Sequence, residues 1–589
     1  MKVNLYWLPL AIVIYLFSSC AGDPVDKEPV INFNNEGNPI YVRLANEPDR
    51  LNPLTTVNTY SRTVIEQIHA SLMTFDPVSL EMVPQLVEGA PAVEEHEDGT
   101  ISYTFQLRGE ATWTDGKPVT VEDVAFSFKA MFNPKVNSAP YRGYFDFIGD
   151  ILVYPDVPGK FSVIANKKYI LAEPAISNMV VLPEHVFDPE QIMASYQLSD
   201  LVDPAKVEKL LKDDPGLTQF AEQFNGTEFS RNKDYIVGAG AYELDSWDEG
   251  NKIVLKRKQN WWADAVVDKN SSLIAHPAEV VFRILKDQKT ASTALKGGEL
   301  DAAGQLDSKD FSELKDNKFV LEQFDLHTPT SANVYYIGIN NKNPKLSDKR
   351  VRRALAHLID VDAVIELLYD GYAERLVGPF PKIRPYYHKD LPLIEYDVNK
   401  AIALLEEAGW QDSDDDGVFD KMIDGQKVDM ELSYLTTQSS EFGSKLSLMF
   451  QENASKAKVR VNILSKEFRA ISADLKNRDF ELVSRAYGLD PLPDDPKQFW
   501  HTSSDTPNGS NRWGFGDAES DALIDSIRTT LDAAERAVLY KQFQELFYEE
   551  QPIIMLFSPK EKIAISKRLK GEPTILKPGF LVNTFEVLK

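Results

Sequence analysis

The sequence predicts a mixed α/β protein with more than one lobe, and three observations support this. The chain has 589 residues, which is more than one hydrophobic core usually holds. Strand-like and helix-like segments alternate from about residue 39 to the C-terminus. The composition, 43% hydrophobic and 26% charged, is that of a globular protein. No repeat with a period of roughly 20–50 residues stands out, so we expect no repeat architecture.

Three strands are predicted from their hydrophobic pattern. A short apolar run of strand length lies just after the polar N-terminal region. A second segment alternates apolar and polar side chains with period two, as a half-buried strand requires. A third strand-like segment lies in the second half of the chain. These segments are Ile40–Leu44, Ile101–Leu107 and Val428–Leu432.

Helices are predicted by apolar residues at helical spacing and by their end signals. Residues 62–72 place Ile65, Ile68, His69 and Leu72 on one face. Thr120 is expected to cap the next helix, since the acids of 122–123 follow in its first turn. Later helices are predicted over 349–368 and 401–408, and Gly409 stops the second of these.

An apolar run near the N-terminus indicates export. Leu5–Phe17 has 13 residues and follows Lys2. It is shorter than the roughly 20 residues that span a bilayer, but it suits a signal-peptide core. No later segment has 18 uninterrupted apolar residues, so we expect no membrane span.

The only cysteine of the chain, Cys20, directly follows two serines at the end of this run. This arrangement resembles a bacterial lipobox, in which Phe17 departs from the usual aliphatic residue. We therefore expect residues 1–19 to be a lipoprotein signal peptide, Cys20 to carry the lipid and 20–36 to form a tether. The alternative is an ordinary secretory signal with an accidental cysteine. A lipidated Cys20 would leave no thiol for catalysis or disulfides.

The charge excludes one class of partner. The formal net charge is −26, whereas binding to DNA or RNA requires a basic surface that neutralises phosphates. We therefore expect no nucleic-acid partner.

Several short motifs, in the same order along some 540 residues, resemble the extracytoplasmic solute-binding proteins of ABC importers. The resemblance is to family 5, which contains dipeptide- and oligopeptide-binding proteins. The motifs that carry it are Glu47–Pro53, Tyr103–Arg108, Trp113–Val124, Gly238–Tyr242, Asn260–Trp262, Ala294–Asp301, Asp348–Leu355, Leu404–Trp410 and Gln551–Ile554.

The resemblance implies a three-lobed fold of the periplasmic-binding-protein type (type II, cluster C), with two crossing strands as the hinge. Lobe I is then expected to be discontinuous, lobe II an insertion, and lobe III the large remaining part. The implied boundaries are 37–75, 180–280 and 553–589 for lobe I, 76–179 for lobe II and 281–552 for lobe III.

The resemblance also implies a function. The chain would be the lipid-anchored, extracytoplasmic binding component of an ABC importer, in the periplasm or at the bacterial cell surface. It would capture short peptides in the cleft between lobes I and III and pass them to permease and ATPase subunits. We expect a monomer that is not an enzyme and requires no cofactor.

A peptide-binding site needs an acid for the ligand amine, a base for its carboxylate and strands that pair with its backbone. The segment 484–491 resembles the family segment that supplies these groups. By this resemblance Asp490 receives the amine and Arg485 the carboxylate. The spacing differs from the family pattern, so Asp494 is a rival amine site. Asp490 also fits a plain turn-capping role before Pro491.

The opposite wall of the cleft is expected in the loop after Pro53, at Asn58, Thr59 and Tyr60. Flat aromatic side chains would complete the site, because ligand sites are mostly apolar with few placed polar groups. Each candidate aromatic fits a position in the protein core better than a ligand contact. The candidates are Tyr487, Trp500 and Trp513.

Other functions fit the sequence less well. A peptidase is disfavoured, because the chain has no His-Glu-x-x-His helix or Gly-x-Ser-x-Gly turn and its eight histidines stand apart. The resembled family also contains binders of nickel chelates, haem and oligosaccharides, so the fold does not name the cargo. A surface lipoprotein that captures glycans without an importer would be mostly helical, unlike this chain.

An acidic stretch, QDSDDDGVFD at 411–420, fits the start of a calcium loop. Position twelve is Ile423, where a calcium sensor places a bidentate glutamate, so we predict no sensor. The stretch is then a surface turn of lobe III, either a plain acidic loop or a weak structural calcium site. Its ligands would be Asp412, Asp414, Asp416, the carbonyl group of Val418, and Asp420.

Overall fold

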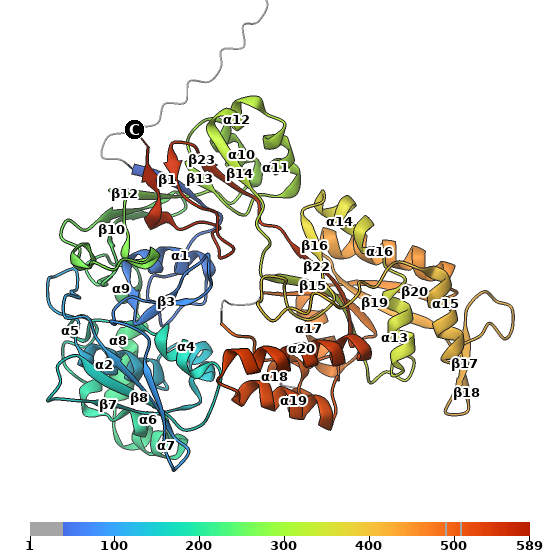
Figure 1. Cartoon of the computed structure of the whole chain (residues 1–589), viewed down its shortest axis with the longest axis horizontal. Coiled ribbons are helices and arrows are strands. Elements are labelled where there is room, and N and C mark those ends of the chain that lie inside the picture. The colour runs from blue at the N-terminus through green and yellow to red at the C-terminus, as the bar shows by residue number, and fades with distance from the viewer. Residues whose placement is uncertain (1–38, 489–491, 507–508, 589) are drawn as a thin grey trace, which may run out of the picture.

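The computed structural model describes residues 39–488, 492–506 and 509–588. Two large mixed sheets lie in different halves of the molecule, and a smaller antiparallel sheet lies below the first (Figure 1). We call the regions around the seven-, four- and six-stranded sheets lobes I, II and III. The mixed α/β class predicted from the sequence is confirmed.

Lobe I joins segments from three distant parts of the chain. The Asp301 carboxylate accepts hydrogen bonds from the Tyr41 N–H (2.8 Å) and from the Arg568 side chain (2.6 Å to Nη2). These bonds join the N-terminal, middle and C-terminal segments of lobe I. The sheet order is β10 (Tyr242–Asp248), β11 (Lys252–Arg257), β12 (Glu279–Ile284), β1 (Pro39–Leu44), β13 (Ala302–Ala303), β23 (Ile563–Ser566) and β14 (Phe324–His327). Its helices are α1 (Thr59–Ile68), α10 (Gln288–Lys296), α11 (Ser308–Lys315) and α12 (Lys318–Gln323).

Lobe II extends beyond its predicted end at residue 179. Phe220 packs edge-on against Phe126 at 5.9 Å, and the Asn133 amide donates to the Leu217 carbonyl group at 2.9 Å. Its sheet order is β5 (Ala92–Glu95), β6 (Ile101–Gln106), β8 (Lys160–Ala165) and β7 (Ile148–Val153). The helices of this region are α2 (Val121–Phe132), α3 (Ala139–Arg142), α4 (Ala172–Ser177), α5 (Glu184–Phe187), α6 (Leu198–Leu201), α7 (Pro204–Asp213), α8 (Gly216–Phe224) and α9 (Glu228–Arg231).

Lobe III has its own hydrophobic core under a six-stranded sheet. The sheet order is β16 (Ala373–Arg375), β22 (Ile553–Pro559), β15 (Asn333–Ile339), β21 (Leu482–Gly488), β19 (Glu431–Thr437) and β20 (Arg460–Lys466). The helices are α13 (Lys349–Ala356), α14 (Val361–Tyr369), α15 (Val398–Glu407), α16 (Glu441–Lys456), α17 (Phe468–Asn477), α18 (Lys497–Trp500), α19 (Ala518–Thr529) and α20 (Ala533–Glu550).

Four two-stranded pairs lie outside the three large sheets in the described residues, together with a few isolated single-residue bridges. The two-stranded pairs are β2 (Ala70–Ser71) with β9 (Val180–Val181), β3 (Met73–Phe75) with β4 (Met82–Pro84), β17 (Asp420–Ile423) with β18 (Gln426–Asp429), and β24 (Leu569–Lys570) with β25 (Glu586–Val587).

Two segments cross between lobes I and III. Residues 328–332 connect β14 to β15, and residues 560–562 connect β22 to β23. They are bonded to one another, since the Ser331 N–H donates to the Pro559 carbonyl group at 2.9 Å and the Glu561 N–H to that of Pro329 at 2.8 Å. We call them the crossing segments.

The crossing segments, and not residues 281 and 553, divide lobe I from lobe III. Strands β12, β13 and β14 pair in the first sheet, although residues 281–552 were predicted to belong to lobe III. Strand β22 pairs in the third-lobe sheet, although 553–589 were predicted to belong to lobe I. Local hydrophobic pattern does not reveal the partner of a strand, which explains both differences.

End signals predicted from the sequence are confirmed in part. Thr120 caps α2, because its hydroxyl accepts from the Asp123 N–H at 3.2 Å and the Asp123 carboxylate accepts from the Thr120 N–H at 2.9 Å. The single helix predicted over 349–368 is two helices. The second begins where the Asp360 side chain caps α14 by accepting from the Ala363 N–H at 2.9 Å.

Candidate ligand-binding site

An unpaired strand edge lies at the end of the lobe III sheet next to lobe I. Strand β21 pairs with β15 from Leu482 to Gly488, whereas β19 pairs with it only at Leu482 and Val483. Beyond Val483, the second edge of β21 has no strand partner among the described residues. Asn333, opposite Gly488, directly follows a crossing segment, which places this edge beside lobe I. An extended peptide adds to such an edge as a further strand.

Arg485 presents a positive charge on this strand. Its guanidinium group lies 5.4 Å from the centroid of the Phe468 ring, and the Phe468 side chain is 58% exposed. Within the described ranges no acidic side chain forms an ion pair with Arg485. A guanidinium group without an acidic partner is suited to a carboxylate ligand, which it binds through two parallel hydrogen bonds. The role predicted for Arg485 remains a prediction.

Asp494 forms a buried ion pair with Arg384. The Arg384 guanidinium group donates to both carboxylate oxygens of Asp494, at 2.8 and 3.0 Å, and Tyr386 donates its hydroxyl at 2.5 Å. Asp494 is 7% exposed and Arg384 is 5% exposed. Asp494 was predicted as a rival site for the ligand amine, but its carboxylate already has a cationic partner in the interior.

The three candidate aromatics differ in their surroundings. Tyr487 is half-buried, stacks on Phe499 at 5.5 Å and donates its hydroxyl to the Pro379 carbonyl group at 2.5 Å. Trp500 and Trp513 are each only 3% exposed, so they are core residues and offer no free face to a ligand. The predicted role of the two tryptophans as ligand platforms is corrected accordingly.

The wall predicted in lobe I is built on the start of α1. Asn58 caps this helix, because its side-chain oxygen accepts from the Tyr60 N–H at 2.8 Å. Thr59 is exposed, and the Tyr60 hydroxyl donates to the Gln305 side chain at 3.3 Å. Gln305 lies next to Leu306, whose N–H donates to the Lys562 carbonyl group at 3.3 Å. The wall therefore lies beside a crossing segment.

Gln305 was not anticipated from the sequence. Its φ of 58° is uncommon for a residue other than glycine. Its carbonyl group is held in place by Arg43 at 3.1 Å and by the Gln288 amide at 3.1 Å. Backbone conformations of this kind cluster at ligand-binding positions, and no local sequence signal marks this one.

Glu66 was also missed. It lies on the exposed side of α1 with Thr59 and Arg62, which precede it by seven and four residues, as neighbours on one helix face do. Loss of solvation next to the surrounding protein raises the pKa of Glu66 to about 7, and the positive charge of Arg62 partly opposes this rise.

Two predicted residues lie outside the described residues. They are Asp490, the candidate for the ligand amine, and Cys20, the candidate for lipidation. Both roles remain predictions.

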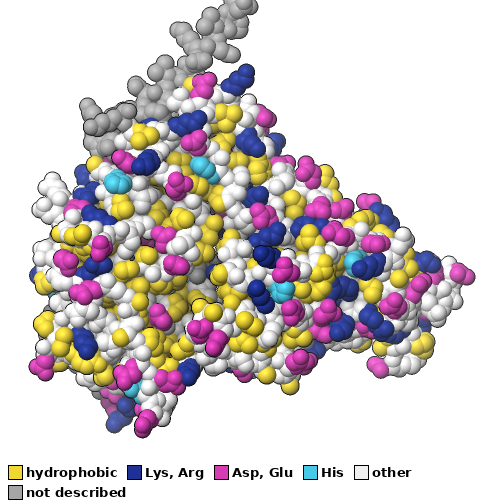
Figure 2. Space-filling model, in the orientation of Figure 1, with side chains coloured by type: hydrophobic (Ala, Val, Ile, Leu, Met, Phe, Trp, Pro, Cys, Tyr) yellow, Lys and Arg dark blue, Asp and Glu magenta, His cyan; other side chains and the backbone are white. Residues whose placement is uncertain are grey.

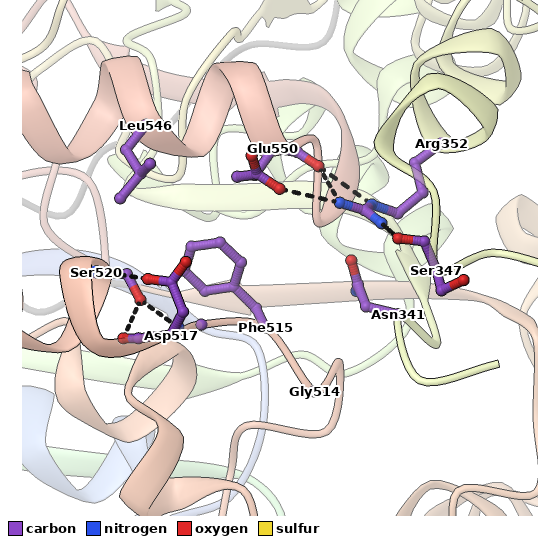
Figure 3. Close-up of a pocket in the computed structure, with 10 residues that line it drawn as sticks. Asn341, Ser347, Arg352, Gly514, Phe515, Asp517, Ser520, Leu546 and Glu550 are labelled. Atoms are coloured by element: carbon purple, nitrogen blue, oxygen red, sulfur yellow. Dashed lines mark hydrogen bonds and ion pairs between the residues drawn. The ribbon is translucent and has the colours of Figure 1, made fainter. Parts of the chain in front are cut away.

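A cavity of about 160 Å³ lies inside lobe III and not between the lobes (Figure 3). Arg352 on its wall donates to the backbone carbonyl groups of Glu550 and Gln551, each at 3.1 Å from Nε, and to that of Ser347 at 2.7 Å. These bonds tie α13 to the end of α20. The cavity therefore belongs to the packing of α13, α19 and α20 and was not part of the predicted site.

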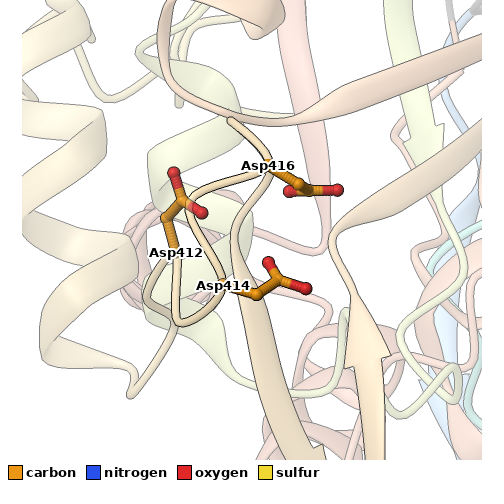
Figure 4. A group of neighbouring side chains, drawn as sticks. All are labelled: Asp412, Asp414 and Asp416. Atoms are coloured by element: carbon orange, nitrogen blue, oxygen red, sulfur yellow. The ribbon is translucent and has the colours of Figure 1, made fainter.

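The aspartate loop brings three predicted calcium ligands together. Carboxylate oxygens of Asp412, Asp414 and Asp416 lie within 4.8 Å of one another (Figure 4). Asp420 points elsewhere, since its carboxylate accepts from the Ser413 N–H at 2.9 Å and hydroxyl at 2.8 Å. Three of the five predicted ligands therefore lie together, and the part of the Val418 carbonyl group remains a prediction.

Three cations already neutralise these carboxylates. Lys458 pairs with Asp412 at 2.9 Å, Lys427 pairs with Asp414, and Arg460 lies 3.8 Å from Asp416. A calcium ion would have to displace them, so the predicted site should be weak.

We expect calcium to bind the purified protein with a Kd of about 10⁻⁴ to 10⁻³ M, the range of weak extracellular sites. Replacing Asp414 with asparagine should abolish the binding that isothermal titration calorimetry detects. Replacing Lys427 with glutamine should strengthen it, because a competing cation is removed. Asp429→Asn, an exposed acid on β18, is the control and should change little. Equal heats in the Asp414 and Asp429 variants would contradict the site.

The relation to known proteins follows from the whole chain. A family model described as bacterial extracellular solute-binding proteins, family 5, middle, matches residues 81–510. The chain belongs to this family. Family 5 proteins are the non-enzymatic solute-binding components of ABC importers, so the expectation that this chain is not an enzyme is confirmed. No helix in the described ranges is long and apolar enough to cross a membrane.

Three relatives of this family 5 protein illustrate how the named ligands differ among similar proteins. The oligopeptide-binding protein AppA of Bacillus subtilis is 24% identical over 97% of this chain and 96% of its own length. Its structure with a nonapeptide has a TM-score of 0.65 at 21% identity and covers 94% of this chain and 99% of AppA.

NikZ of Campylobacter jejuni, solved with Ni(L-His), has a TM-score of 0.63 at 22% identity, over 91% of this chain and 95% of NikZ. Heme-binding protein A of Haemophilus influenzae is 24% identical over 86% of this chain and 84% of that protein. The structural likeness shows that the fold is shared.

Figure 2 shows how charged side chains are distributed over one face of the molecule. Acidic and basic side chains are interspersed over the face seen in Figure 2. With a net charge of −26, this gives no extended basic surface on that face.

Proposed function

We propose that this protein captures short peptides in the cleft between lobes I and III and delivers them to a membrane permease. The observation that carries the proposal is the unpaired edge of β21 beside lobe I. Such an edge binds the backbone of an extended ligand whatever its side chains are. A transporter of mixed peptides needs this tolerance.

The charges around the edge match the two ends of a peptide. Arg485 lies on β21 itself and forms no ion pair with a described acid, so it would bind the ligand carboxylate. The family resemblance assigns the amine to Asp490. Glu66 offers a second carboxyl group on α1, in the lobe that also supplies Tyr60 and Gln305.

Closure of the cleft would use the crossing segments. They are short and bonded to each other, and they are the two chain connections described between the lobes. Binding proteins of this architecture close around ligands by bending at such connections. A lipid on Cys20 would hold the protein near its permease and raise its effective concentration there.

A nickel chelate, haem or an oligosaccharide is the alternative cargo, because relatives are named as nickel and haem binders. In the described part of the chain, the one group of three or more histidine, cysteine or acidic residues at metal-binding distance is the aspartate loop. That loop is exposed on lobe III and contains no histidine. This absence of a histidine cluster favours the peptide.

Two measurements test the proposal. Native mass spectrometry of the protein as purified should show a retained ligand of peptide mass. After its removal, tri-alanine at about 100 times its Kd should stabilise the protein by about 2.7 kcal/mol, because it binds only the folded state. Maltotriose, nickel–histidine and haem serve as comparison ligands. Stabilisation by one of these, without stabilisation by any short peptide, would overturn the peptide assignment.

A further inference from the structure

A small polar contact joins lobes II and III. The Tyr169 hydroxyl donates to an Asp495 carboxylate oxygen at 2.9 Å, and the Ile170 N–H donates to the Arg528 carbonyl group at 3.0 Å. In Figure 1, α4, which begins just after these residues, lies beside α18 and α19. The crossing segments join lobe III to lobe I, so this contact closes the molecule at a second place.

The contact is built around one carboxylate. The Arg528 Nε lies 3.0 and 2.9 Å from the two oxygens of Asp495, and its guanidinium carbon lies 5.1 Å from the centroid of the Tyr169 ring. The side chains of Asp495 and Arg528 are 10% and 21% exposed. Burial and the charge of Asp495 raise the pKa of Tyr169, so its hydroxyl remains protonated and donates.

Asp494, the residue before Asp495, is held by contacts inside lobe III. Asp494 pairs with Arg384 inside lobe III, and its backbone carbonyl group accepts from the Tyr540 hydroxyl. Asp494 therefore bonds the segment to lobe III, and Asp495 bonds it to Tyr169 of lobe II. Farther along this segment, Phe499 stacks on Tyr487 of β21. The segment 492–500 thus connects the lobe II contact with the strand proposed to bind the ligand.

We propose that Tyr169, Asp495 and Arg528 form a latch that holds lobe II against lobe III and positions the segment 492–500 against β21. The three are positioning residues and need not touch the ligand. The part of the proposal that concerns ligand release rests on the proposed function. In the described residues the latch joins the lobes through one side-chain hydrogen bond, one backbone hydrogen bond and the contact of Arg528 with the Tyr169 ring. Under the proposed function it opens for ligand exchange.

The test measures the distance between the lobes and the rate of ligand release. Because Cys20 is the only cysteine, two labels can be introduced in a Cys20→Ser background, at the exposed positions Lys209 of lobe II and Gln542 of lobe III. Pulsed electron spin resonance then gives the distance distribution with and without tri-alanine. Tyr169→Phe should shift the ligand-free distribution to longer distances and speed tri-alanine release about 5- to 10-fold.

Controls separate the latch from general stability. Tyr196→Phe removes a similar hydrogen bond, 2.8 Å long to Asp214, that lies inside lobe II. It should leave both readouts unchanged. Arg528→Ala should act like Tyr169→Phe, and Arg528→Lys should restore part of the loss.

Wild-type distances and release rates in both Tyr169→Phe and Arg528→Ala would overturn the latch. If tri-alanine does not bind the wild-type protein, the peptide function fails, whereas the ligand-free distances still decide whether the latch exists.

Discussion

Replacing Asp494 with alanine should destabilise lobe III by about 3–5 kcal/mol, the cost of leaving one charge of a buried pair without its partner. Arg384 would keep its charge while 5% exposed, and the fork of hydrogen bonds at 2.8 and 3.0 Å would be lost. Tyr386, which stacks on Tyr540 at 3.9 Å between ring centroids, would also lose its hydroxyl acceptor. Calorimetric unfolding that resolves the lobes would measure the loss.

A matched variant tests whether burial is the reason. Glu441→Ala removes an ion pair with Lys445 whose side chains are 81% and 53% exposed, and it should cost at most about 0.5 kcal/mol. Replacing Arg384 and Asp494 together with apolar residues of similar volume should recover most of the stability, since no unpaired charge is left. A cost below about 1 kcal/mol for Asp494→Ala would contradict the assignment of this pair.

Replacing Arg485 with alanine should weaken the binding of tri-alanine by about 30- to 150-fold, which corresponds to about 2–3 kcal/mol. The stability of the ligand-free protein should change little, because Arg485 forms no ion pair in the described structure and its guanidinium group lies over the exposed Phe468 ring. Isothermal titration calorimetry of both proteins gives the two affinities.

Amidated and acetylated peptides identify which charge is bound. If Arg485 binds the carboxylate, C-terminally amidated tri-alanine should bind the wild-type protein weakly and Arg485→Ala equally weakly. If Asp490 binds the amine, Asp490→Ala should bind N-acetylated tri-alanine and free tri-alanine equally weakly. Arg350→Ala, an exposed arginine of α13, is the control. The same free-acid preference in Arg485→Ala as in the wild type would refute the carboxylate assignment.

Elements with strong local signals were predicted well. Residues 101–107 alternate with period two, and β6 covers 101–106 with Ile101, Tyr103 and Phe105 buried. The Thr120 cap was predicted from the residues that form it. The helix predicted over 349–368 failed at a cap, because Asp360 competes for the backbone and starts a second helix.

The binding site was harder to predict, because its parts interact over long distances in the chain. Trp500 and Trp513 look the same in sequence whether they line a ligand or a core, and burial decided for the core. The partner of Asp494 lies 110 residues away, at Arg384, and no local pattern connects them. Gln305 is marked by its backbone conformation alone.

The sequence by itself determined the family and the mixed α/β class, because these depend on motif order and local periodicity. Only the tertiary structure decided which strands share a sheet, where the crossing segments divide the lobes, and which charges are already paired. Those features depend on contacts between residues hundreds of positions apart, such as Tyr41 with Asp301, at a sequence separation of 260. Burial and pairing are properties of that folded arrangement, and they distinguish Arg485, which has no acidic partner among the described residues, from Asp494, which has Arg384.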